Sequence, residues 1–137
     1  MRLTPSQLNQ LIAQARRDAP NETCGLIGGK NGRALQIYPL KNVDENPRIR
    51  YLADPQELLH AVRDVEEAHD WEVLAIYHSH PASPAYPSPT DVARAFYPDA
   101  VYILISLMNP DAVQVRGFHI RDEKISEVTL EIEEDKA

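Results

Sequence analysis

The sequence predicts an α/β fold, in which a mixed β-sheet is flanked by helices. Two observations support this fold class. Segments with apolar residues at helical spacing alternate along the chain with short segments that have the length and pattern of strands. The chain has 137 residues, of which 43% are hydrophobic, enough for one core and too few residues for two domains. We therefore expect one domain over residues 1–137, with an acidic, frayed tail at residues 133–137.

Three segments begin with the same helix-start pattern, a capping side chain followed by proline: Thr4–Pro5, Asp54–Pro55 and Ser88–Pro89. The first predicts a helix that ends before Pro20, and Gln7 completes its capping box. The second predicts a helix with an apolar stripe made of Leu58, Leu59, Val62 and Val65. The third predicts a helix that begins near Ser88.

Strands are expected where apolar residues run without interruption or alternate with polar residues. Residues 22–29 and 33–38 predict a hairpin around a turn at residues 30–32. Val73–Tyr77 and Val101–Leu107 are continuous apolar runs, as central strands covered on both faces require. Other strands are expected at residues 113–120, in a last segment carrying Val128, Leu130 and Ile132, and at residues 49–52, where the polar loop 41–50 ends.

Composition excludes several classes of protein. A net charge of −7 argues against binding to nucleic acid or to an anionic membrane surface, because both partners carry negative charge. No apolar run approaches the roughly 18 residues of a membrane span, and the first seven residues lack a signal-peptide pattern. The single cysteine, Cys24, excludes an intrachain disulfide and fits a reducing compartment. We therefore expect a cytoplasmic protein.

The segment that carries chemistry is His78-Ser79-His80-Pro81, followed after six residues by Ser88 and after two more by Asp91. Residues i and i+2 of a strand point to the same face, so His78 and His80 can direct two imidazoles to one point. Asp91, in the first turn of a predicted helix, can supply a carboxylate. Two imidazoles and one carboxylate suit Zn²⁺, and three protein ligands leave a fourth position for water, as in catalytic zinc sites.

Simpler explanations exist for each part of this pattern. Two histidines near the end of a strand can be ordinary half-exposed side chains, and Ser88 and Asp91 also form a capping box. A zinc hydrolase needs a general base as well, and Glu22, at the junction of the first helix and first strand, is our candidate. Glu45 and Glu57 compete with Glu22 for this role on spacing alone.

Taken together, Glu22, the His-Ser-His-Pro segment, Ser88 and Asp91 resemble the motif of the JAMM (MPN+) zinc metallopeptidases, compact prokaryotic branch. The resemblance is complete at every motif position and extends to the segment Glu22-Thr23-Cys24-Gly25-Leu26. It implies the layered MPN fold, similar to that of cytidine deaminases. It also implies one Zn²⁺ per chain held by His78, His80 and Asp91, with Glu22 as general acid/base and Ser88 stabilising the oxyanion.

The resemblance further implies a substrate, namely the bond after the carboxyl-terminal Gly-Gly of a ubiquitin-like or sulfur-carrier protein. Residues 46–51 and 82–86 are candidate walls for the extended tail, although both also suit plain surface loops. A non-catalytic scaffold that binds ubiquitin-like proteins and a zinc amidase acting on a small substrate are the alternative functions. Cys24 either lies near the metal or is simply buried.

Overall fold

The computed structural model describes residues 1–135. Its helices are α1 (Pro5–Asp18), α2 (Pro55–Arg63) and α3 (Pro89–Ala93), and a π-helical turn, η1 (Asp64–Ala68), continues α2. The strands are β1 (Arg2–Leu3), β2 (Cys24–Lys30), β3 (Arg33–Leu40), β4 (Glu72–His80), β5 (Val101–Ser106), β6 (Gln114–Arg121), β7 (Lys124–Val128) and β8 (Glu131–Ile132).

In the described residues, all of these strands join one sheet in the order β7-β6-β5-β4-β2-β3-β1-β8. The pair β4–β5 is parallel, as are the short pairs of β1 with β3 and with β8. The other neighbours are antiparallel. The predicted fold class, a mixed sheet flanked by helices, is therefore confirmed.

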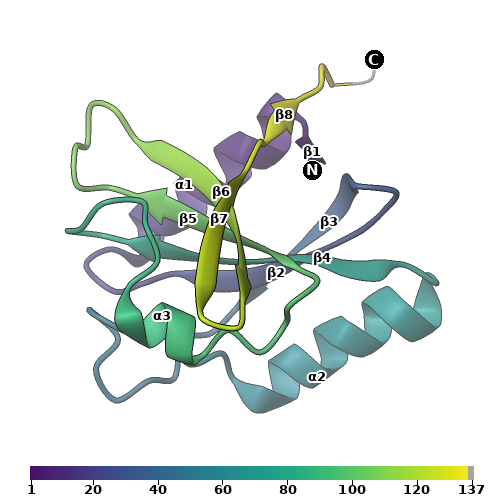
Figure 1. Cartoon of the computed structure of the whole chain (residues 1–137), viewed down its shortest axis with the longest axis horizontal. Coiled ribbons are helices and arrows are strands. Elements are labelled where there is room, and N and C mark those ends of the chain that lie inside the picture. Colours follow the sequence, from purple (N-terminus) through teal and green to yellow (C-terminus); the bar gives the residue numbers. More distant parts are fainter. Residues whose placement is uncertain (136–137) are drawn as a thin grey trace.

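Helices cover both faces of the sheet (Figure 1). On one face, Leu11 of α1 packs in a core cluster with Tyr77 and Ile103. On the other face, Val65 of η1 packs with Ile76 and Tyr102, and α3 and α2 contribute to the same cluster. Strands β4 and β5 are buried on both sides, which explains their uninterrupted apolar sequences.

Strand pairing brings the first candidate residues together. Cys24 of β2 lies opposite His78 of β4, and the backbone bond from Ser79 N–H to the Thr23 carbonyl extends this register. Glu22 comes just before these paired residues, and its carboxyl group interacts electrostatically with His80 at the end of β4. Because alternate residues share a face, His78 and His80 lie with Ile76 on the face covered by α2 and α3.

Each helix begins as its capping pattern predicts. Thr4 and Gln7 form the capping box of α1, and the Asp54 carboxylate accepts from two amides of α2. Ser88 and Asp91 form the capping box of α3, a short helix of five residues that ends at Ala93. The capping interpretation of Ser88 and Asp91 is thus correct.

Two predictions about strands are wrong. Residues 49–52 form no strand, because the amides of Ile49 and Arg50 turn back to the Asn46 carbonyl, and an isolated bridge between Asn42 and Ala53 closes the loop. The predicted last strand is divided into β7 and β8. Between them Leu130 turns inward, and its side chain packs over Gly117, where it occupies the space of a missing Cβ.

The two-residue strand β1 had no signal in the sequence. It pairs with β3 and β8, and so brings the two ends of the described chain to one corner of the sheet (Figure 1). There Glu133 accepts hydrogen bonds from Arg2 and Arg33, and Asp135 accepts one from Ser6. The frayed tail at residues 133–137 stays a prediction, because residues 136–137 lie outside the described part. Within that part, no helix combines the length and apolar character that crossing a membrane requires.

Candidate metal centre

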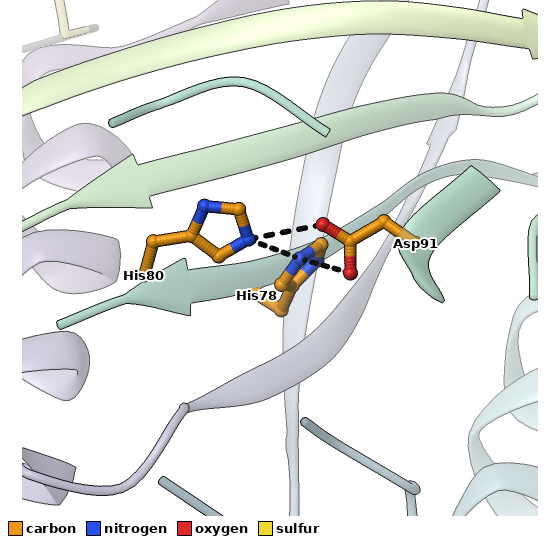
Figure 2. A group of neighbouring side chains, drawn as sticks. All are labelled: His78, His80 and Asp91. Carbon is orange, nitrogen blue, oxygen red and sulfur yellow. Dashed lines mark hydrogen bonds and ion pairs between the residues drawn. The ribbon is translucent and has the colours of Figure 1, made fainter. Parts of the chain in front are cut away.

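Two imidazoles and one carboxylate converge at the end of β4 (Figure 2). The Nε2 atoms of His78 and His80 are 3.2 Å apart. Asp91 reaches across from α3 and places Oδ1 3.1 Å from His78 Nε2 and Oδ2 3.0 Å from His80 Nε2. Both histidines are buried, with exposed fractions of 1% and 4%. The structure therefore brings together the three residues that the sequence singled out as metal ligands.

The donor set fits a zinc ion. Two nitrogens bound to one tetrahedral Zn²⁺ at their usual bond lengths are separated by about 3.3 Å, close to the spacing of the two imidazoles. When both Nε2 atoms are unprotonated, their lone pairs and the carboxylate repel one another, and a cation between them removes that repulsion. The site is thus suited in spacing and in charge to a divalent cation.

The orientation of His80 is fixed from behind. Its Nδ1 lies 2.8 Å from the carbonyl oxygen of Pro84. A carbonyl can only accept, so Nδ1 carries the proton, and in the neutral ring Nε2 presents its lone pair to the centre. His78 is held differently: its ring stacks on Tyr51 with the centroids 4.6 Å apart, and its Nδ1 has no hydrogen-bond partner among residues 1–135.

Asp91 is held as a carboxylate. Burial by itself would raise its pKa, but the close contacts with His78 and His80 and the hydrogen bond from the Ser88 backbone amide hold the pKa well below its usual range. Burial also lowers the pKa of His78. In this environment His78 and Asp91 are in the protonation states that a metal ligand requires, a neutral imidazole and an anion.

Glu22 has the opposite character. It is 5% exposed, and its Oε1 has no hydrogen-bond partner in the described part of the chain. Burial raises the pKa of Glu22 to about 8, the charge of His80 lowers it, and the charges of Asp91 and Asp44 raise it. A buried carboxyl group that interacts electrostatically with two candidate ligands, and whose pKa lies near neutrality, can both take and release a proton.

The Ser88 hydroxyl group caps helix α3 through its oxygen, and its hydrogen is still available as a donor. Its Oγ accepts the N–H of Asp91 at 3.1 Å, which completes the cap of α3. The hydroxyl hydrogen has no acceptor among the residues that the structure describes. Ser88 can therefore cap the helix that carries Asp91 and still donate a hydrogen bond to another group.

The segment after β4 is tied to the sheet at three consecutive carbonyl groups. The carbonyl of Ser83 accepts from Ser106 Oγ at 2.6 Å, that of Pro84 from His80, and that of Ala85 from Arg116 at 3.2 Å. One of the two candidate walls, residues 82–86, is therefore rigidly attached beside His80.

The other candidate wall, residues 46–51, lies beside Glu22 and His78. The Pro47 carbonyl accepts the Glu22 amide at 2.7 Å, while Tyr51 supplies the ring that stacks on His78. Sequence reasoning missed Tyr51 as a neighbour of a candidate ligand, and it missed the roles of Asn42 and Asp44, which tie this loop together. A short polar loop with Asn and Asp near its start was the available signal.

Cys24 is not a ligand. Its side chain is buried, Sγ lies 3.4 Å from the Leu40 carbonyl, and burial raises the pKa of the thiol to about 12. Burial therefore favours the protonated thiol, and because Cys24 also lies opposite His78, it is both buried and close to the candidate metal centre.

The chain is similar in sequence and in structure to several known proteins. The family described as prokaryotic homologs of the JAB domain matches residues 4–118. A protein of Mycobacterium tuberculosis named CysO-cysteine peptidase is 39% identical over 129 residues, which cover 93% of this chain and 87% of the relative. A protein of Haloferax volcanii named desampylase is 37% identical over 91 residues, 65% of each chain.

Among solved structures, the solution structure of a protein from Desulfitobacterium hafniense superposes with a TM-score of 0.87. It is 38% identical in sequence, and the match covers 98% of this chain and 93% of the other. The family match includes every candidate site residue from Glu22 to Asp91. The chain therefore belongs to the prokaryotic JAB family, the JAMM-type hydrolases that its motif resembles.

Proposed function

We propose that the protein is a zinc-dependent peptidase that hydrolyses the amide or isopeptide bond after the carboxyl-terminal Gly-Gly of a ubiquitin-like or sulfur-carrier protein. The observation that carries the proposal is the convergence of His78, His80 and Asp91 on one point, with the buried carboxyl group of Glu22 close enough to interact electrostatically with two of them. The relatives named for peptidase and desampylase activity support the same reaction class.

His78, His80 and Asp91 would hold one Zn²⁺, which when bound supplies an acidified water and an electrophile for the scissile carbonyl. Glu22 takes the proton from the attacking water on its carboxylate and transfers it to the leaving nitrogen. The Ser88 hydroxyl donates to the oxygen that becomes negative as the carbonyl is attacked. The products are a free carboxyl terminus and an amine, and no covalent enzyme intermediate is needed.

The proposed substrate has an extended tail that lies between residues 46–51 and 82–86. Glycines suit such a tail because they allow the backbone to approach closely, and contact through backbone groups reads little side-chain identity. A protein with a net charge of −7 favours a partner with a basic face. The single, reduced cysteine supports a reducing compartment, and we place the reaction in the cytoplasm.

The test uses a small carrier protein ending in Gly-Gly and extended by a short peptide, incubated with the zinc-loaded protein and followed by intact mass. We expect one cut, after the second glycine. A matched substrate with Ala-Ala in place of Gly-Gly should be cut at least tenfold more slowly. No cut in either substrate, together with release of amine from a small amide, would establish the small-molecule amidase instead.

A non-catalytic scaffold is distinguished by the same experiment, because it would bind the carrier without changing its mass. This alternative has less support, since Glu22, Ser88 and the three candidate ligands are all present in the chain.

A further inference from the structure

Asn42 lies outside the proposed reaction machinery, and its side-chain amide uses both its nitrogen and its oxygen in hydrogen bonds. Asn42 Nδ2 lies 3.0 Å from the Glu22 carbonyl and 3.0 Å from the Arg50 carbonyl, with the Pro47 carbonyl at 3.4 Å. Its Oδ1 accepts the amides of Asp44 and Leu52 at 3.0 and 3.1 Å. Because carbonyl oxygens surround Nδ2 and backbone amides surround Oδ1, the amide group of Asn42 can take only one of its two flipped orientations.

These bonds connect three stretches of chain. Asp44 lies at the beginning of the loop 42–53, Arg50 and Leu52 lie at its end, and Glu22 lies two residues before β2. A single side chain thus closes the loop and attaches it to the residue proposed as the general base.

Glu22 depends on that attachment for its position. It precedes β2 and has no place in the sheet ladder. Its N–H donates to the Pro47 carbonyl, and its carbonyl accepts from Asn42, so both main-chain groups are held by the loop 42–53. Its carboxyl group, by contrast, has an unpartnered buried oxygen among the described residues. The side chain is therefore placed through its backbone and by packing.

The same loop reaches the other side of the site. Asp44 accepts Arg94 Nη1 at 3.1 Å, and Arg94 also donates to the Tyr51 carbonyl at 3.0 Å. Arg94 is the C-cap of α3, the helix that carries Asp91. The loop consequently spans the distance from the proposed base to the helix of the third ligand.

We propose that Asn42 is a positioning residue for Glu22. It fixes the backbone of the base relative to the metal ligands through the donor half of its amide and closes the loop through the acceptor half. This inference rests on the proposed function, because it assigns Asn42 its role through the proton transfer at Glu22.

The test is Asn42→Asp, which retains the acceptor for Asp44 and Leu52 and removes both donors. The control is Asn109→Asp. Asn109 also accepts, at 3.1 Å, the amide two residues further on, is exposed, and undergoes the same change of charge. For Asn42→Asp we expect kcat on the Gly-Gly fusion to fall by about tenfold to a hundredfold, with KM changed less than about threefold. The control should match the wild type, and zinc content should stay at one per chain in both.

A second measurement does not depend on activity. Hydrogen exchange of the Glu22 amide, resolved by NMR, should be at least tenfold faster in Asn42→Asp, while the amides of β4 and β5 keep their protection. If Asn42→Asp folds poorly, Asn42→Ser, which is too short to span the three carbonyls, is measured in the same way. Wild-type kcat or wild-type exchange at Glu22 in a folded variant would overturn the proposal.

The two hypotheses fail differently. A wild-type protein that leaves the fusion uncut refutes the proposed function, and the exchange of the Glu22 amide then decides by itself whether Asn42 positions that residue.

Discussion

The two carboxylates of the site, Asp91 and Glu22, are held in opposite ways. Asp91 has both oxygens engaged, by His78, by His80 and by the Ser88 amide, and its pKa is held low. Glu22 is also shielded from solvent, yet one of its oxygens has no partner among residues 1–135, and burial raises its pKa to about 8. One carboxylate is fixed as an anion, and the other is free to exchange a proton.

The surroundings of the two groups differ in the same sense. The half of the site around Asp91 is attached to the sheet, through the cap of α3 and through the carbonyls that His80, Ser106 and Arg116 fix. The half around Glu22 is attached to a loop that is held by its own side chains. Metal ligands need a rigid frame, whereas a proton carrier needs an orientation and an unsatisfied atom.

The largest effect is expected when one of the three candidate metal ligands is removed. His78→Ala and Asp91→Ala each remove one of three ligands, so we expect metal content to fall from about one per chain to near zero and cleavage to become undetectable. Metal analysis after gel filtration measures the first, and intact mass of the fusion the second. His60→Ala, on the exposed surface of α2, is the control and should retain metal and activity. A stoichiometric metal in Asp91→Ala would show that the centre lies elsewhere.

Replacing Glu22, the proposed general base, should lower turnover without affecting metal binding. Glu22→Gln retains the size of the side chain and removes its ability to take a proton, so kcat should fall by about 10²- to 10⁴-fold with zinc content unchanged. Glu45→Gln, an exposed carboxylate that competed for this role in the sequence, should behave as the wild type. Near-normal turnover by Glu22→Gln would move the base to another residue.

Ser88 belongs to the half of the site around Asp91, and substitutions there test its two proposed roles, as helix cap and as oxyanion donor. Ser88→Ala should lower kcat by about tenfold to a hundredfold through loss of an oxyanion donor, and stability by about 1 kcal/mol through loss of the cap. Ser88→Thr retains a hydroxyl group for both purposes and should restore most of each. If Thr restores stability but Ala and Thr have equal kcat, Ser88 is a cap and nothing more.

The smallest effect concerns how the free energy of unfolding of the metal-free protein changes with pH. In the folded chain the pKa of Glu22 is about 8, above the ordinary value of 4.5, so the folded state binds this proton more tightly than the unfolded state does. The contribution of Glu22 to stability is therefore present in full below about pH 4.5 and is lost as the pH rises to about 8.

Glu22→Gln has no such proton to lose. Relative to the wild type, its free energy of unfolding should improve by about 1 to 3 kcal/mol between these pH values. Urea unfolding at a series of pH values measures the difference, and parallel curves for the two proteins would mean that the Glu22 carboxyl group is well solvated.

Local patterns in the sequence were enough to predict much of this site. The spacing of His78 and His80 on one strand fixes their common face, and the capping box fixes where Asp91 begins a helix. Glu22 could be preferred over Glu45 and Glu57 only by resemblance to the family, because its place near His80 depends on contacts between segments that are far apart in the chain. Its role remains a prediction.

Other features had no local signal. A two-residue strand such as β1 has no periodicity, and its place depends on contacts with β3 and β8. The loop 42–53 has enough β-branched and aromatic residues to suggest a strand at its end, but its backbone amides donate to the side-chain oxygens of Asn42 and Asp44 in place of ladder pairing. Hydrogen bonds between a side chain and main-chain groups many residues away in the sequence cannot be predicted from residue spacing alone.

The prolines at 81, 84, 87 and 89 have a consequence for any polypeptide that approaches from that side. They remove four amide donors from a stretch of nine residues, and the carbonyls of residues 83–85 already accept hydrogen bonds from Ser106, His80 and Arg116. An incoming chain thus finds almost nothing there with which to extend the sheet. Recognition on this flank must depend on contour and on exposed rings such as Tyr86, whereas main-chain pairing is left to other edges of the molecule.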